Sequence, residues 1–362
     1  MKKNKVLFFG PYLQPVTGQS LSFQQSYEGY NGDKILVNTT TFGNSKILNS
    51  IYCFLIVPFL FLFKSFNVVY FTCTRSKFGA LKDIQLLLLC NLFNKKVVNH
   101  LHGADFILFY HNSGSLKRIL KYCYEQIDKS IVLLPSMAEQ FAEFSSMELE
   151  VLQNCYTYEY ANIDVDFNNK KRQIVYLSNI IYSKGIFVFL EAARNILKID
   201  SDIKIKIAGL PMADSFKSER EMQNLFNDAF NKIKIDFPER IFYLGTVKGK
   251  EKIDLLLESS VFVLPTFYKI EAFPITIIEA MRFGNAIITT NHNYLEDIIN
   301  HKNGKLIEIK SSEGIVNAVN DLFLDRIKLT EIQNHNINEA LNKYSPTTYN
   351  ENLYKILEGI IK

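Results

Sequence analysis

The chain has 362 residues, and its 48% hydrophobic and 22% charged residues are typical of a folded globular protein. This length fits two domains of roughly 150–180 residues each. The 41 basic and 37 acidic residues leave a net charge of only +4, and no basic tract with interleaved aromatic residues is present. The composition therefore excludes a protein that binds nucleic acid.

The five cysteines, at positions 53, 73, 90, 123 and 155, are odd in number and match no metal-site spacing. Four of the five lie in apolar segments. We expect reduced, buried thiols in a cytosolic protein.

Two apolar segments near the N-terminus resemble targeting or membrane sequences. Residues 6–9 are followed at once by Gly10 and Pro11, so we expect a first β-strand rather than a signal peptide. Residues 51–63 are uncharged but interrupted by Pro58, and they fall short of the ~20 residues needed to cross a bilayer. We expect a buried helix there, in preference to a helix that contacts a membrane surface.

The second half of the chain alternates short apolar runs with longer amphipathic segments. This pattern, with short glycine-containing turns, predicts βαβ units and a parallel sheet covered on both faces. The expected strands are 173–177, 203–208, 241–244, 261–264 and 286–289, and the expected helices are 185–197, 219–235, 250–258 and 275–283.

The first half repeats this alternation more loosely. Its expected strands are 6–9, 34–38, 68–71, 96–100 and 131–134, with helices at 82–93 and 116–126. The sequence therefore predicts an α/β protein with two Rossmann-like domains. We place the first domain at 1–166, joined by a C-terminal helix at 345–362, and the second at 172–344 after a polar linker.

The segment 265–284 carries the strongest chemical signal. Pro274 and Gly284 mark the beginning and end of one helix. Because this helix follows a strand and a loop, its backbone N–H groups and dipole suit an anionic diphosphate. Glu271, in the loop, can accept hydrogen bonds from sugar hydroxyls or stabilise positive charge on a sugar. Glu279, inside the helix, suits the vicinal diol of a ribose; two solvated surface carboxylates are the alternative.

Residues 271–284, continued by 285–290, resemble the signature of the family-4 retaining glycosyltransferases. Further segments follow in the family's order, namely 10–18, 99–106, 176–185, 205–209 and 242–245. The resemblance implies the GT-B fold, in which two Rossmann-like domains face a central cleft. It also implies transfer of a sugar from a nucleoside-diphosphate donor, a UDP-sugar, to an acceptor hydroxyl with retained anomeric configuration.

The resemblance also implies the site residues. His102 and Glu271 correspond to catalytic positions, with a structural histidine as the alternative for His102 and His100 as a competing candidate. Donor binding is expected from Gly18, Lys184, Phe273, Pro274, Ile275 and Glu279, and further candidates are Asp105, Asn179 and Gly209. Gly18 could equally be an ordinary turn glycine.

The chain departs from the family at several positions. Asn179 stands where the family often has an arginine, so phosphate binding would depend on Lys184 and backbone donors, or on another cation such as Arg75 or Lys269. Ala272 replaces a usual glycine, and Thr17 precedes Gly18 where paired glycines are usual.

We expect no metal and no cofactor beyond the nucleotide-sugar, because no Asp-x-Asp motif follows a strand. The acceptor class implied by the family is a glycan or lipid-linked glycan of cell-envelope polysaccharide assembly. If the basic stretch 116–121 and the apolar segment 51–63 both face outward, an acceptor at the inner face of the membrane follows. An epimerase or phosphorylase, or a non-catalytic partner subunit, is the alternative on the same fold.

Overall fold

The computed structural model describes residues 5–12, 17–43 and 45–360. Its internal contacts divide the chain into two compact units. Unit 1 comprises Met1–Cys155 and Pro346–Lys362, and unit 2 comprises Tyr156–Ser345. The polar segment predicted as a linker, 164–172, therefore lies inside unit 2.

Unit 1 contains a parallel six-stranded sheet in the order β2-β1-β3-β4-β5-β6. Every paired neighbour runs in the same direction. Its central strands are continuous apolar runs, as expected for a sheet buried on both faces. The strands are β1 (Lys5–Gly10), β2 (Asp33–Asn38), β3 (Val68–Thr72), β4 (Lys96–His100), β5 (Lys129–Val132) and β6 (Glu148–Val151).

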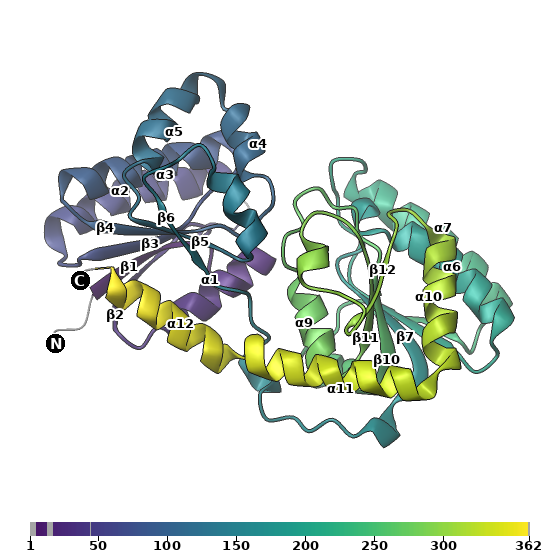
Figure 1. Cartoon of the computed structure of the whole chain (residues 1–362). Helices are drawn as coiled ribbons and strands as arrows, with labels where there is room; N and C mark the ends of the chain where they lie inside the picture. The colour runs from purple at the N-terminus through teal and green to yellow at the C-terminus, as the bar shows by residue number, and fades with distance from the viewer. Residues whose placement is uncertain (1–4, 13–16, 44, 361–362) are drawn as a thin grey trace. The chain divides into compact units, whose positions relative to one another are not determined.

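Helices cover both faces of this sheet (Figure 1). One face carries α2 (Lys46–Phe63), α3 (Lys77–Leu92) and α5 (Lys117–Tyr124), with the short α4 (Phe106–His111) beside them. The other face carries α1 (Gly18–Gly29) and α12 (Pro346–Gly359). The predicted return of the C-terminal helix to the first domain is confirmed.

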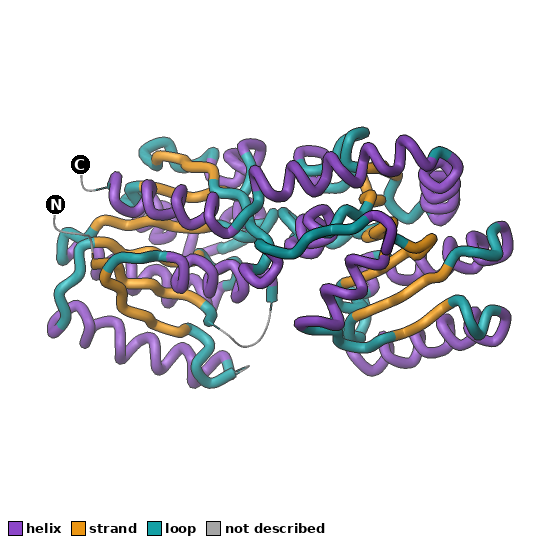
Figure 2. The backbone as a smooth tube through the Cα atoms, turned by 90° about the horizontal axis from the view of Figure 1, so that it is seen from below, coloured by secondary structure: helices purple, strands orange, loops and turns teal. Residues whose placement is uncertain are grey.

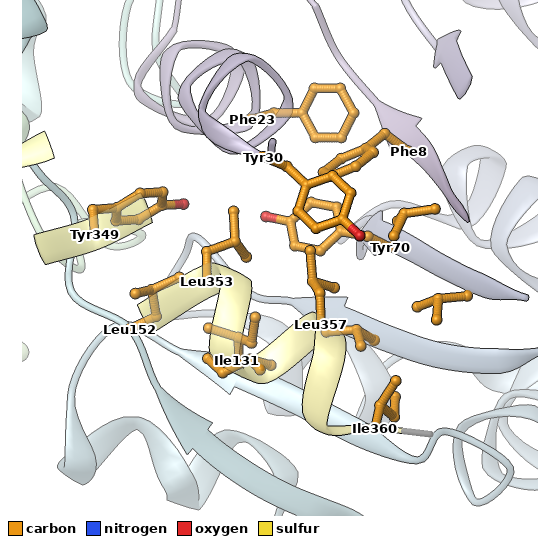
Figure 3. Packing of buried hydrophobic residues seen from close by; sticks show 14 of the residues in the cluster. Phe8, Phe23, Tyr30, Tyr70, Ile131, Leu152, Tyr349, Leu353, Leu357 and Ile360 are labelled. Atoms are coloured by element: carbon orange, nitrogen blue, oxygen red, sulfur yellow. The ribbon is translucent and has the colours of Figure 1, made fainter. Parts of the chain in front are cut away.

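The core beneath α12 explains why this helix belongs to unit 1. Leu353 and Leu357 of α12 join Phe8 of β1 and Tyr70 of β3 in one buried cluster (Figure 3). The ring centroids of Phe8 and Tyr70 lie 5.0 Å apart. Tyr349 of α12 also exchanges a 2.6 Å hydrogen bond with Ser26 of α1, so both apolar and polar contacts hold the helix.

Unit 2 contains a second parallel six-stranded sheet, in the order β12-β11-β10-β7-β8-β9. Figure 2 shows its strands between layers of helices. The chain order reverses between β7 and β10, which makes this pair the topological switch point, where ligands bind in doubly wound sheets. The strands are β7 (Lys171–Leu177), β8 (Lys204–Ala208), β9 (Ile241–Tyr243), β10 (Ser259–Leu264), β11 (Ala286–Thr290) and β12 (Gly304–Ile307).

Helices α6 to α9 of unit 2 match the four helices predicted from the sequence, whereas α10 and α11 were not predicted. Helix α9 packs on α11, and α10 packs on α6. They are α6 (Ile186–Ile199), α7 (Glu219–Asp236), α8 (Gly249–Glu258), α9 (Ile275–Arg282), α10 (Ser312–Leu324) and α11 (Arg326–Lys343).

The expectation of a buried helix at 51–63 is wrong. The segment is part of α2, but only a stripe through Cys53, Val57 and Leu60 faces the core. The side chains of Leu55 and Phe63 are 71% and 68% exposed. Apolar composition predicted burial on all sides, whereas unit 1 covers one side of the helix. The five cysteines, in contrast, are all free and buried, as expected.

Candidate functional site

The loops that follow β7 and β10 meet at the switch point of unit 2. The Phe267 N–H, after β10, donates a 2.8 Å hydrogen bond to the Ser183 carbonyl, after β7. Gly185 has φ +76°, and a Cβ at this position would lie 2.0 Å from the Pro265 carbonyl oxygen. A glycine is required there because the two loops approach so closely.

Lys184 and Glu271 are brought together by these two loops. The Lys184 ammonium lies 3.3 Å from a Glu271 carboxylate oxygen and 5.7 Å from the centre of the Tyr268 ring. Glu271 is 8% exposed, so its charge is compensated by Lys184 in a largely dry environment. The predicted phosphate cation and the predicted catalytic carboxylate thus form one ion pair.

The loop that carries Glu271 is held by Asn293, which the sequence analysis did not single out. The Asn293 side-chain amide donates hydrogen bonds of 3.1 Å to the Lys269 carbonyl and 2.9 Å to the Glu271 carbonyl. Asn293 lies beyond β11 with φ 50°, a conformation that asparagine tolerates better than most residues. No motif marks this position, because its role depends on a loop 22 residues earlier in the chain.

The turn before Lys184 is fixed by Asp214, which also escaped sequence reasoning. The Asp214 carboxylate accepts hydrogen bonds from the Ser183 N–H (2.9 Å) and hydroxyl (2.7 Å). Burial opposes the charge, but these bonds and the backbone N–H bonds lower the Asp214 pKa below its ordinary value. A stable carboxylate therefore orients the segment that presents Lys184.

Helix α9 begins beside this ion pair. Pro274 is its N-cap and supplies no side-chain cap, and Gly284 follows its end with φ +67°. An N-terminus without a side-chain cap presents backbone N–H groups and the positive end of the helix dipole to an anion. The flanking Phe273 is buried and packs edge-on against Tyr344, while Ile275 is half-buried.

Glu279 is not the solvated surface carboxylate of the alternative interpretation. It is 2% exposed, and Lys252 of α8 lies 2.6 Å from one oxygen. The Thr157 hydroxyl lies 3.4 Å from the other oxygen. Both oxygens are therefore engaged, and Lys252 is a second lysine that pairs with a predicted donor-site glutamate.

Gly209, directly after β8, lies next to Asn179, in the loop after β7. Gly209 has φ +140°, and a Cβ there would lie 1.8 Å from the Ser178 carbonyl oxygen. A glycine is therefore needed at this position because the backbone packs closely against the loop after β7. Asn179 is exposed, and its amide supplies no positive charge where the family often has an arginine.

In unit 1, the structure separates the two candidate histidines. Tyr70 and the His100 Nδ1 share a 2.6 Å hydrogen bond, and the Tyr70 hydroxyl donates to Ser26. His102 lies against His100 with ring centroids 4.0 Å apart, and both of its buried nitrogens lack a hydrogen-bond partner among the described residues. His100 is thus part of a structural network through its Nδ1, although its Nε2 also lacks a partner among the described residues, whereas both nitrogens of His102 retain hydrogen-bonding capacity.

The burial of His102 predicts a pH-dependent stability. Burial, aided by the nearby Arg75 charge, lowers the His102 pKa to about 3, against ~6.5 in an unfolded chain. Between these two pH values the unfolded state binds more protons than the folded state. The stability that neutral, buried His102 contributes is therefore complete above pH ~6.5 and is lost as the pH falls toward 3. We expect His102→Asn to reduce the loss of unfolding free energy between pH 7 and 5 by about 1–2 kcal/mol. Urea unfolding at pH 7 and pH 5 measures the free energy of unfolding at each pH. The control is His301→Asn, at an exposed position. An identical loss of unfolding free energy in His102→Asn and in the wild type would contradict the prediction.

Asp105 is held by Arg75, whose Nε lies 2.5 Å from the carboxylate. Gly103 leaves room for that guanidinium, because a Cβ there would lie 2.6 Å from the Arg75 Cζ. Gly18 is the first residue of α1 and lies within the capping box formed by Thr17 and Ser20, and a Cβ on it would meet nothing within 4 Å. Residues 13–16 of the predicted glycine loop lie outside the described residues.

Among the described residues, no group of three or more histidine, cysteine, aspartate or glutamate side chains could hold a metal ion.

The chain is similar to known glycosyltransferases. Residues 162–342, half of the chain, match the glycosyl transferases group 1 family, and the chain belongs to this family. It is 25% identical over 182 residues to an uncharacterised glycosyltransferase, MJ1607, of Methanocaldococcus jannaschii, covering 50% of this chain and 43% of that protein. It is also 25% identical over 155 residues to the lipopolysaccharide 1,2-N-acetylglucosaminetransferase of Salmonella typhimurium, covering 42% of this chain and 39% of that protein. The chain thus spans less than half the length of these curated relatives.

Solved structures show the same fold over the whole chain. Anabaena HepE with UDP and glucose has a TM-score of 0.73 at 14% identity, covering 98% of this chain and 99% of that chain. The sucrose-phosphate synthase of Thermosynechococcus elongatus has a TM-score of 0.74 at 12% identity and 99% coverage of both. The predicted GT-B class, with two parallel sheets flanked by helices, is confirmed.

Proposed function

We propose that this chain transfers a sugar from a UDP-sugar to an acceptor hydroxyl with retained anomeric configuration, as the resemblance to the family-4 enzymes suggests. The observation that carries the proposal is the Lys184–Glu271 pair at the switch point of unit 2. The UDP and glucose in the HepE structure and the sugar named for the Salmonella relative support the donor class. The acceptor is a glycan or lipid-linked glycan, by analogy with the same relative.

In the proposed reaction the donor diphosphate competes with Glu271 for Lys184. A diphosphate carries more negative charge than one carboxylate, so it would draw the Lys184 ammonium away from Glu271. The departing diphosphate would then be stabilised by Lys184 and the N–H groups at the start of α9. Glu271 would be released to accept hydrogen bonds from the sugar or to stabilise its developing positive charge.

The remaining roles follow from the same contacts. Glu279 would accept hydrogen bonds from the two ribose hydroxyls while the contact with Lys252 orients its carboxylate. His102 stays neutral at pH 7 and would act by hydrogen bonding rather than as a positive charge. Because Lys184 and the helix end neutralise the leaving group, the proposed reaction uses no resident metal.

The test is a panel of UDP-, GDP- and ADP-sugars followed by thermal unfolding and product analysis. We expect UDP and one UDP-sugar to raise the melting temperature, because a ligand of the folded state stabilises it. Free UDP should be released faster when an acceptor is added, and the glycoside formed should keep the donor's anomeric configuration.

Two results would replace the proposal. Conversion of the donor sugar without acceptor would indicate an epimerase. Absence of binding to any nucleotide would indicate a non-catalytic subunit, which the exposed Asn179 in place of an arginine would then explain.

A further inference from the structure

Helix α2 carries an apolar surface that no described part of the chain covers. Its large side chains are 39–73% exposed along its outer side: Ile47, Leu48, Ile51, Phe54, Leu55, Phe59, Leu62 and Phe63. A helix on the surface of a soluble domain normally presents polar residues there. Among the described residues, α2 is the one helix long and apolar enough, by length and composition, to cross a membrane.

Helix α3 extends this surface. Phe78 and Leu92 are each 72% exposed, and Leu81 and Leu88 lie on the same stripe. Gln85, within the stripe, donates a 3.0 Å hydrogen bond to the Phe54 carbonyl of α2. The exposed stripe of α3 therefore borders α2, and the exposed side chains of the two helices form one apolar face. Figure 1 shows both helices in the layer that covers one side of the unit 1 sheet. A patch built from so many large apolar side chains is typical of an interaction surface.

The helices at this face carry more basic than acidic residues. Helix α5 adjoins α3, and the Asn91 amide of α3 donates to the Tyr122 hydroxyl of α5. Six residues of α2, α3 and α5 are basic, namely Lys46, Lys77, Lys82, Lys117, Arg118 and Lys121. Their one acidic residue, Asp83, is buried and bound to Thr74. Of these six, Lys121 lies 3.8 Å from the carboxylate of Glu125, the residue after α5. The remaining excess of basic residues beside an apolar face complements an anionic surface.

We propose that the α2–α3 face binds the surface of an anionic lipid bilayer, with the apolar side chains entering the headgroup region and the lysines contacting lipid phosphates. A second copy of the chain fits less well, because it would bring two sets of basic residues together. The helix lies on the bilayer rather than across it, because Cys53, Val57 and Leu60 pack into unit 1. In this proposal the chain lies on a membrane surface, with the exposed side of α2 and the exposed Arg118 and Lys121 of α5 turned outward.

Flotation with lipid vesicles tests this surface. The full-length protein is mixed at low salt with vesicles of phosphatidylcholine alone or with a third of phosphatidylglycerol. We expect flotation with the anionic vesicles, and Leu55→Glu and Phe59→Glu should each lower the partition coefficient roughly tenfold or more. Lys46→Gln and Lys77→Gln should each lower it roughly fivefold on anionic vesicles only. Leu324→Glu, at an 85% exposed position of unit 2, is the matched control and should float like the wild type.

Several results would overturn the proposal. One is the absence of flotation at low salt, and another is equal flotation of Leu55→Glu and the wild type. If the bound protein resisted extraction by alkaline carbonate, the helix would span the membrane. Concentration-dependent dimerisation abolished by Leu55→Glu would assign the face to a second copy. Nucleotide binding by the same variants, measured in parallel, separates this proposal from that of the donor site, because the face lies in unit 1.

Discussion

Replacing Glu271 with glutamine is expected to lower kcat by about 10²- to 10³-fold, the range observed when a preorganised electrostatic contact to a transition state is removed. Glutamine keeps the size and hydrogen-bond acceptor of the side chain but removes its charge. Because Glu271 is nearly buried, that charge acts in a low-dielectric environment, where its effect on a developing positive sugar is large. The KM for the donor should change far less, since the diphosphate contacts remain.

The control for this variant is Glu296→Gln, an exposed carboxylate in the segment after β11. It should retain wild-type kcat. Steady-state kinetics with the best donor from the nucleotide-sugar panel measures both variants, and circular dichroism confirms that both are folded. A kcat for Glu271→Gln within a fewfold of the wild type would remove Glu271 from the catalytic step.

Replacing Lys184 with methionine is expected to weaken UDP binding by roughly 10- to 10²-fold, as a charge-assisted hydrogen bond contributes about 1.5–3 kcal/mol. Methionine preserves the aliphatic length that packs beside Tyr268 but cannot neutralise the diphosphate. Asn179 offers no second cation at the end of β7. The loss should therefore be larger in this chain than where an arginine shares the charge.

Two comparisons make the Lys184 result specific. Titration calorimetry with uridine, which has no phosphate, should give the same affinity for the variant and the wild type. Lys269→Met, an exposed lysine of the neighbouring loop, should bind UDP as the wild type does. If Lys269→Met lost UDP affinity and Lys184→Met did not, the phosphate cation would be Lys269.

Most of the fold was predictable because hydrophobic periodicity follows from the layers of an α/β protein. The strands of unit 2 around the switch point are short apolar runs between glycine turns, and all were predicted. The edge strands β6 and β12 were not. Strand β6 has the sequence Glu-Leu-Glu-Val and lies mostly exposed, so it carries no buried-strand pattern. Strand β12 has the sequence Gly-Lys-Leu-Ile and is mostly half-buried, so it carries no continuous apolar run either.

Helix α2 shows where composition fails. Its sequence is apolar on all sides, and such a pattern is equally typical of a core helix and of one that faces lipid. Which side is covered depends on the packing of α2 against α3 and the sheet, and this information is not in the helix itself. The wrong expectation of burial and the proposed membrane surface have the same physical origin.

The candidate site was predictable to the extent that it lies in contiguous motifs. Lys184, Glu271 and Glu279 were named from their sequence context, and the structure shows that the first two pair. Lys252 and Asn293 were missed because each acts on a residue more than twenty positions away in another element. Such contacts depend on the order of strands in the sheet, which no local pattern records.

The most direct test of the account is a crystal structure of the full chain with UDP. We predict that the diphosphate contacts the Lys184 ammonium and the N–H groups at the start of α9, that the ribose hydroxyls bind Glu279, and that Glu271 is separated from Lys184. UDP bound elsewhere, with the Lys184–Glu271 and Lys252–Glu279 pairs unchanged, would contradict the donor site described for unit 2.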